Sequence, residues 1–336
     1  MTTLNYDSNK YYDIYKQWIK NGCKVNDIVT ILDITTLNLT KIPKDIDNFI
    51  NLQILNCSCN KLTKLPETLC NLINLQKLDC SNNKLIKLPE TLGNLINLQE
   101  LDCSNNKLIE LPETLGNLIN LQELDCSLNQ LTKLPKSLCY LINLQKLHCD
   151  YNQLIELPET LGNLINLQEL ICNDNKLIRL PKTLKNLINL QYLDCKDNKL
   201  IKLPTTLGNL INLKKLYCRE NQLTKMPISI MKLKHLENIN HDKNILVPLN
   251  LQRFIGRIKN KINNNVHNNT IQASLLDSIN ILLSETITKD IDLIDDNILN
   301  NKTKSILYNF IEDKTVGELL VNFEELLVYI LEKIDN

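Results

Sequence analysis

Apolar residues recur along this chain with a 23-residue period. The segment 51–66 returns, lightly edited, with further copies starting at Asn74, Asn97, Asn120, Asn143, Asn166, Asn189 and Asn212. Within each copy, inward positions such as Leu55 and Cys57 alternate with polar ones, which is the pattern of a half-buried strand. A unit this short cannot bury its own apolar face, so we expect the copies to stack side by side into a solenoid.

The second part of each copy predicts the other side of this solenoid. The pair Leu65 and Pro66 redirects the chain, because proline fixes its own backbone angle and donates no backbone hydrogen bond. Leu69 and Leu72 then lie three residues apart, as a short helical turn requires. The pattern therefore predicts parallel strands on a concave side and short helical turns on a convex side.

The full spacing points to a known family. Aligned from Leu52, each copy reads L-x-x-L-x-C-x-x-N-x-L-x-x-L-P-x-x-L-x-x-L-x-N. This resembles the leucine-rich repeat signature, with Cys in the third Leu position, over about two thirds of the chain. The resemblance implies a right-handed curved solenoid in which Asn60 and its equivalents form a ladder to the backbone. The L-P-x-x-L variant is similar to the intracellular class, which includes Ras-pathway scaffolds and phosphatase regulators.

The repeat fades at both ends. Residues 28–50 keep the apolar frame but have Leu37 where the ladder needs Asn, and residues 235–246 place His241 in the Cys position. We therefore expect a solenoid over residues 28–247, with nine full turns and a partial tenth. Terminal turns expose apolar faces, so residues 1–27 are interpreted as an N-terminal helical cap, with an amphipathic helix over 6–20 whose aromatic stripe acts as a lid.

Beyond Pro248 the period disappears and helical patterns replace it. They cover 251–262, 271–283, 304–311 and 316–334, and the last begins with a capping box from Thr315 to Glu318. Asn-rich stretches at 263–269 separate the first of these helices from the others. The predicted fold class is an α/β repeat solenoid, a curved leucine-rich repeat array with a concave parallel sheet, plus a small all-α C-terminal domain over 248–336.

Eight of the 12 cysteines occupy the same position in successive copies. They are Cys57, Cys80, Cys103, Cys126, Cys149, Cys172, Cys195 and Cys218. A zinc site would need paired Cys or nearby His ligands, and neighbours on parallel strands do not have the crossed geometry of a disulfide. We expect a column of buried free thiols, which favours the cytosol or the nucleus over secretion. The N-terminal residues resemble no secretory leader, and no run is long enough to span a membrane.

Charge and motifs narrow the function further. The 38 basic and 38 acidic residues cancel, so no overall field attracts nucleic acid or an anionic membrane. No phosphate loop, dinucleotide fingerprint, metalloprotease motif or nucleophile elbow occurs. Bacterial effector ubiquitin ligases join similar repeats to a helical domain with a nucleophilic Cys, but here no cysteine follows Cys218. We expect no enzyme activity, cofactor, metal or small-molecule substrate, and a partner that is another protein.

Differences between copies indicate where that partner binds. The outward positions are nearly identical in the early copies, as at Asp79, Asp102 and Asp125, and they diverge from the sixth turn onward. Tyrosine and arginine there are typical of interface hot spots. Drift of solvated positions accounts for the same divergence, so both interpretations stay open. The candidate partner-binding residues are His148, Asp150, Tyr151, Tyr192, Asp194, Lys196, Tyr217 and Arg219.

These features predict a non-catalytic, cytoplasmic module for protein–protein interaction, a scaffold in signal transduction that binds on its concave face. A second acidic group, Glu100, Asp102, Glu123 and Asp125, is interpreted as a solvated face rather than a binding site, because exposed charges contribute little. The alternative function is a substrate-recognition subunit whose C-terminal helices recruit a ubiquitin ligase or another signalling enzyme.

Overall fold

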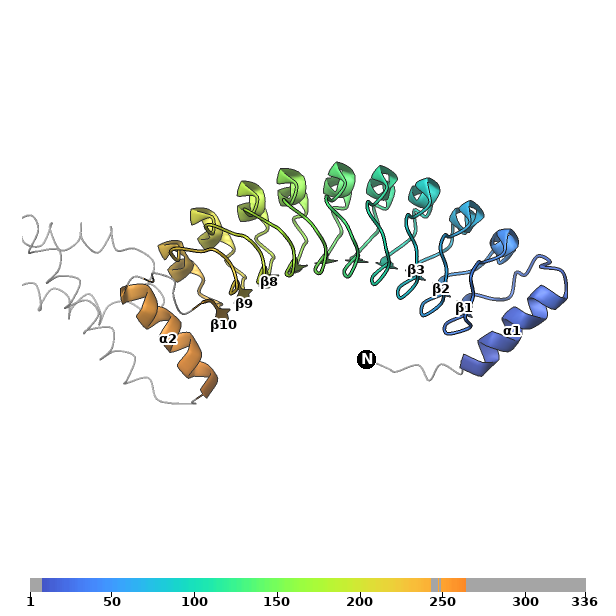
Figure 1. The fold of residues 1–336 in the computed structure, drawn as a ribbon, viewed down its shortest axis with the longest axis horizontal. Coiled ribbons are helices and arrows are strands. Elements are labelled where there is room, and N and C mark those ends of the chain that lie inside the picture. Colours follow the sequence, from blue (N-terminus) through green and yellow to red (C-terminus); the bar gives the residue numbers. More distant parts are fainter. Residues whose placement is uncertain (1–7, 243–246, 248, 264–336) are drawn as a thin grey trace, which may run out of the picture.

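The computed structural model describes residues 8–242, 247 and 249–263. Its strands pair in parallel, in chain order, into one open ten-stranded sheet that lines the inside of an arc (Figure 1). The strands are β1 (Ile31–Asp33), β2 (Ile54–Asn56), β3 (Lys77–Asp79), β4 (Glu100–Asp102), β5 (Glu123–Asp125), β6 (Lys146–His148), β7 (Glu169–Ile171), β8 (Tyr192–Asp194), β9 (Lys215–Tyr217) and β10 (Asn238–Asn240). The predicted solenoid with a concave parallel sheet is confirmed.

A short 3₁₀ helix follows each of the first nine strands on the convex side. These helices are η1 (Lys44–Asn48), η2 (Glu67–Asn71), η3 (Glu90–Asn94), η4 (Glu113–Asn117), η5 (Lys136–Tyr140), η6 (Glu159–Asn163), η7 (Lys182–Asn186), η8 (Thr205–Asn209) and η9 (Ile228–Lys232). Each begins directly after a proline, whose fixed backbone angle sets the helical entry. Some pack so closely that a Cβ at Gly116 would lie 2.6 Å from the backbone oxygen of Ser137.

The strands pair with a constant offset of 23 residues, so equivalent side chains form columns. Leu55 lies opposite Leu78, and both are buried. The eight repeated cysteines form the next inward column and are fully buried free thiols, which confirms that prediction. The Sγ of Cys103 lies 3.3 Å from the carbonyl oxygen of Asp125 in the next repeat and donates to it. Burial raises the pKa of the Cys103 thiol well above its usual value, so it stays protonated.

A ladder of asparagines closes the turns after the strands. The Nδ2 of Asn83 donates to the carbonyl oxygens of Cys57, Cys80 and Ser81 at 3.0, 3.2 and 3.0 Å. Its Oδ1 accepts the Leu62 N–H at 2.9 Å. The same bonds recur from Asn60 to Asn221, as the family resemblance implies. Each asparagine satisfies backbone groups that would otherwise be buried without partners.

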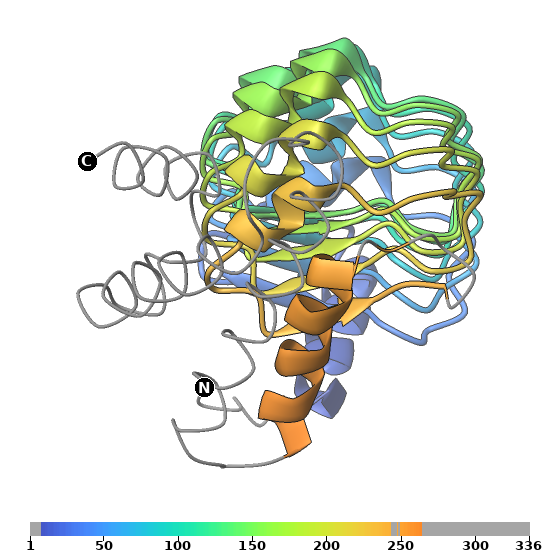
Figure 2. The ribbon, with the colours of Figure 1, turned by 90° about the vertical axis from the view of Figure 1, so that its left-hand side faces the viewer.

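Helices cover both ends of the described array. Helix α1 (Ser8–Lys20) packs against β1, and its Trp18 ring lies 4.6 Å from the ring of Phe49. Helix α2 (Leu249–Asn263) packs against β10 and η9 at the other end (Figure 2). It includes the predicted helix 251–262, whereas those at 271–283, 304–311 and 316–334 lie outside the described residues. No described helix is both long and apolar enough to cross a membrane.

Candidate functional site

The concave surface consists of two columns of side chains from the strands. In nearly every strand the middle residue is buried and the first and third are partly exposed. The first column runs Ile31, Ile54, Lys77, Glu100, Glu123, Lys146, Glu169, Tyr192, Lys215 and Asn238. The third column runs Asp33, Asn56, Asp79, Asp102, Asp125, His148, Ile171, Asp194, Tyr217 and Asn240.

In the early repeats the third column serves the fold. The Oδ1 of Asp102 accepts the N–H of Ser104 at 2.9 Å, and Asp79 and Asp125 accept the corresponding bonds at the same distance. Such bonds between a carboxylate and the backbone two residues ahead stabilise the turn that ends each strand. These aspartates are therefore committed to the turn.

The first column of the same repeats is largely paired. Lys77 Nζ lies 2.6 Å from Glu100 Oε1, and Lys146 Nζ lies 2.6 Å from Glu123 Oε1. Each of the two glutamates in the acidic group of the sequence analysis thus lies next to a lysine. These exposed pairs contribute little stability, and each lysine offsets the charge of the glutamate beside it.

At β6 the pattern changes, because His148 replaces the aspartate of the third column. Its Nδ1 lies 3.6 Å from Asp125 Oδ2 and its Nε2 lies 3.2 Å from Glu169 Oε1. Asp125 and then Glu169 raise the pKa of His148 by stabilising the imidazolium, which outweighs its partial burial. Burial raises the pKa of Asp125, but the bonds to His148 and Ser127 lower it overall. The imidazole therefore joins strands β5, β6 and β7 electrostatically.

Two further predicted residues follow His148 on the turn. Asp150 is partly buried, and burial raises the pKa of its carboxyl to about 6. Tyr151 has a φ of 50°, in the left-handed region, and 48% of its surface is exposed. The turn thus presents a large aromatic ring to solvent beside an acid that takes up a proton near pH 6.

Tyr192 and Tyr217 form an aromatic pair at the other side of the candidate site. Their ring centres lie 5.4 Å apart with an angle of 53° between the planes. The Nζ of Lys215 lies 5.8 Å from the centre of the Tyr192 ring, within the range of a cation–π interaction. Burial, helped by the charge of Asp194, raises the pKa of Tyr192 to about 12, so its hydroxyl stays neutral and can donate a hydrogen bond.

The remaining predicted residues differ in how free they are. Asp194 is only 7% exposed and accepts the Lys196 N–H at 3.1 Å, so it keeps the structural task of the early aspartates. Lys196 is partly exposed beside it. Arg219 is exposed, and its Nη2 lies 2.6 Å from Glu220 Oε1. The structure thus groups His148 with Asp150 and Tyr151, and Tyr192 with Tyr217.

Two residues that the sequence analysis did not select connect these groups. Glu169 contacts His148 and lies opposite Tyr192 in the register, while Lys215 lies over the Tyr192 ring. Both belong to the first column, from which the sequence analysis selected Tyr192 but which it did not compare copy by copy. Reading the first column across the repeats would have found them.

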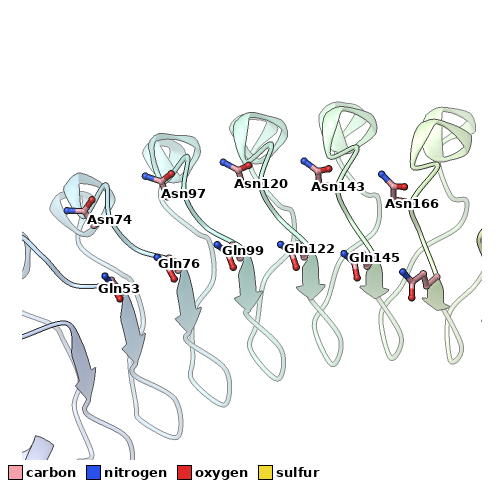
Figure 3. Close-up of a pocket in the computed structure, with 11 residues that line it drawn as sticks. Gln53, Asn74, Gln76, Asn97, Gln99, Asn120, Gln122, Asn143, Gln145 and Asn166 are labelled. Atoms are coloured by element: carbon pink, nitrogen blue, oxygen red, sulfur yellow. The ribbon is translucent and has the colours of Figure 1, made fainter. Parts of the chain in front are cut away.

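A second concavity lies outside the concave face of the sheet. It is a groove of about 700 Å³ that runs along one side of the arc, between the 3₁₀ helices and the starts of the strands (Figure 3). Its lining is entirely amide side chains, namely Gln53, Asn74, Gln76, Asn97, Gln99, Asn120, Gln122, Asn143, Gln145, Asn166 and Gln168. The sequence analysis did not select this column because its residues hardly vary. Across the described ranges, no cluster of His, Cys, Asp and Glu could hold a metal ion.

Comparison with known families finds repeats in several parts of the array. The family described as Leucine Rich Repeat matches residues 51–72, 143–164 and 189–210. The two-copy description, Leucine Rich repeats (2 copies), matches 73–120 and 96–140. No curated protein matches the chain.

Solved structures share the fold. A leucine-rich repeat protein of Leptospira interrogans is 29% identical with a TM-score of 0.50, and the match covers 68% of this chain and 70% of that one. The functional domain of InlJ from Listeria monocytogenes, which includes a cysteine ladder, is 28% identical with a TM-score of 0.57 and coverage of 66% and 47%.

A third similar structure contains a bound partner. It is the ectodomain of the plant membrane receptor kinase GASSHO1/SCHENGEN3 from Arabidopsis thaliana in complex with CASPARIAN STRIP INTEGRITY FACTOR 2. The two chains are 33% identical with a TM-score of 0.56 over 60% of this chain and 26% of that one. This chain thus spans about a quarter of the receptor and about half of the InlJ domain.

Proposed function

The chain belongs to the leucine-rich repeat family, and we propose that it binds a partner protein on its concave face without catalysing a reaction. The observation that carries this proposal is the aromatic pair of Tyr192 and Tyr217. Tyr217 occupies the third-column position that holds a turn-stabilising aspartate in β3 to β5, while Asp194 on the strand of Tyr192 still accepts such a bond. Tyrosine contributes much to interface energy because it buries a large area at little entropic cost.

The size of the concave face suits a protein partner. Ten parallel strands span about 45 Å at the usual spacing of neighbouring strands. That length accommodates a folded domain or a long peptide, whose interface typically covers about 800 Å² on each side. The similar plant ectodomain is solved in complex with CASPARIAN STRIP INTEGRITY FACTOR 2, which supports binding as the activity of such arrays.

The charges of the candidate site favour a partner of mixed charge. Asp150 and Glu169 provide carboxylates, while Lys196, Lys215 and Arg219 provide cations within four neighbouring repeats. Complementary charges steer and orient a partner more than they increase its affinity. An extended segment with one aromatic or aliphatic anchor for the tyrosine pair, flanked by charges of both signs, fits this arrangement.

We also propose that the protein works in the cytoplasm as a scaffold in signal transduction. Its 12 cysteines support this location, because the column of unpaired buried thiols fits a reducing compartment. The alternative is a substrate-recognition subunit whose C-terminal helices recruit a ubiquitin ligase or another signalling enzyme. It depends on the domain over 248–336, and so on its predicted helices at 271–283, 304–311 and 316–334. It stays a prediction, because those residues lie outside the described ranges.

Affinity purification from the native host tests the proposal. The double substitution Tyr192→Ala with Tyr217→Ala should abolish capture of the partner while the melting temperature stays within a few degrees of the wild type. Tyr140→Ala is the matched control, because Tyr140 is 65% exposed on η5 and far from the concave columns. Capture by the double variant at wild-type level would remove the tyrosine pair from the site.

A further inference from the structure

One side of the arc carries no charge over most of its length. It is built from the segments that lead from each 3₁₀ helix to the next strand, which read N-x-I-N-L-Q with one Tyr in the first position. These segments recur seven times at 23-residue intervals, from 48–53 to 186–191. We call their outward side chains the ascending band; the groove in Figure 3 runs along it.

The band exposes a column of isoleucines. Ile73, Ile96 and Ile119 are 57%, 52% and 54% exposed, and every other copy places an isoleucine at this position with similar exposure. An exposed apolar stripe of this length indicates an interaction surface, because isolated exposed isoleucines are ordinary but a continuous column is not.

Amide groups next to this column have unused hydrogen-bonding capacity. The Nδ2 of Asn97 is occupied, since it donates to the Ile73 carbonyl oxygen at 2.8 Å and so fixes the segment. By contrast, the side-chain amides of Gln76, Gln99 and Gln122 make no hydrogen bond to any described residue. A partner could thus meet regularly spaced donors and acceptors beside regularly spaced apolar side chains.

The absence of charge ends sharply at the borders of the band. The residue after each glutamine begins the first column and varies in charge, as Lys77, Glu100 and Tyr192 show. The following two copies of the segment end in Lys214 and Glu237. The positions that border the band therefore differ in charge between copies, whereas the band itself stays uncharged in seven of them.

These properties fit a second copy of this chain better than another occupant. The side chains of the band are spaced by the solenoid repeat. Only a partner with the same spacing can contact all of them along the whole band, and a second copy of this chain has that spacing. An uncharged surface meets itself without repulsion, and a two-fold axis would place each band against the other in antiparallel order. Four outward side chains in each of seven copies match the roughly 20 to 30 residues per side of a stable interface.

We infer that two copies of this protein associate through their ascending bands into a two-fold symmetric dimer. The isoleucine columns pack against each other, and the glutamine amides bond across the interface. The concave face of each copy remains open, so the dimer presents two partner-binding surfaces. This inference does not depend on the proposed function, because the two surfaces share no residue.

Sedimentation velocity of the full chain, from about 1 to about 100 µM, tests the dimer. The variant Ile96→Lys with Ile119→Lys places like charges in the middle of the interface and should weaken the dimer on the order of 100-fold. The matched control is Ile109→Lys with Ile155→Lys, because these isoleucines are 52% and 54% exposed, as the band pair is, but lie after the strands, where a glutamate follows each of them.

The expected result is a dimer for the wild type and the control, and a monomer for the band variant with unchanged circular dichroism. A wild-type chain that stays monomeric up to about 100 µM would overturn the inference and leave the band to a partner of different sequence. Equal dissociation by both variants, or by neither, would also overturn it. Tyr192→Ala with Tyr217→Ala should leave the dimer intact, which separates this test from that of the concave site.

Discussion

The two halves of the concave face share one backbone and differ in what their side chains do. In β3 to β5 the third column is aspartate, and its oxygens hold the next turn. In β6, β7 and β9 the same column holds His148, Ile171 and Tyr217, which do not accept that bond, whereas Asp194 in β8 still does. The turns persist without it, because the asparagine ladder continues beneath them. A side chain at this position that does not bond to the turn is available to a partner.

The substitutions with the largest expected effect test whether the asparagine ladder stabilises both halves of the array equally. Asn106 and Asn198 are 8% and 9% exposed, and each bonds to three carbonyl oxygens and one N–H. Asn106→Ala and Asn198→Ala should each lower the free energy of unfolding by about 2 to 4 kcal/mol, because buried backbone groups lose their partners. Urea unfolding followed by circular dichroism measures both. A clear inequality would mean that the halves differ in their core as well as on their surface.

Substitution of Asp150, which lies in the second half, is expected to increase the free energy of unfolding. Burial raises the pKa of its carboxyl to about 6, above the roughly 3.9 expected when unfolded, so the folded state disfavours the carboxylate. Asp150→Asn should therefore increase the free energy of unfolding by roughly 1 to 2 kcal/mol at neutral pH.

The two pKa values of Asp150, folded and unfolded, determine how the free energy of unfolding changes with pH. The penalty is absent below about pH 4, grows as the pH rises to about 6 and is constant above. The gain of the asparagine variant should follow the same course in urea unfolding series. Asp79→Asn, in the early half, is the control, because its amide oxygen can still accept the Ser81 N–H. A gain for Asp150→Asn that does not depend on pH would contradict the assignment.

His148 gives the smallest effect, with the opposite dependence on pH. Because Asp125 and Glu169 raise the pKa of His148 above its usual 6.5, its pairing stabilises the fold fully below pH 6.5 and is lost as the pH rises through the raised value. His148→Gln should thus cost about 0.2 to 1 kcal/mol at pH 6 and almost nothing at pH 9. Thermal unfolding at both values measures this. A cost that is larger at pH 9 would show that the imidazole is not paired as an imidazolium.

Much of the scaffold could be predicted because the repeat dictates it. The alternation around Leu55 and Cys57 fixes which side chains are buried, and the 23-residue period fixes the register. The contact between His148 and Glu169 could not be predicted, because it joins different columns on neighbouring strands and depends on sheet twist and side-chain rotamers.

The residue type alone also did not predict which side chains of the candidate site are free to contact a partner. Asp194 and Asp150 are both acidic residues of the second half, but Asp194 accepts a backbone bond from the turn, whereas Asp150 lies on the turn itself, two residues beyond the third column. The amide groove escaped notice because its columns are uniform, and only variation was read as a functional signal.

Binding of an identified partner tests the central contrast most directly. Isothermal titration would compare wild-type protein with Tyr192→Ala plus Tyr217→Ala in the second half and with Asp79→Ala plus Asp102→Ala in the first. If released side chains bind and committed ones only hold turns, the tyrosine variant should lose at least tenfold in affinity with little change in stability. The aspartate variant should lose about 1 to 2 kcal/mol of stability and keep its affinity. Equal loss of affinity in both variants, or loss only in the aspartate variant, would contradict the account.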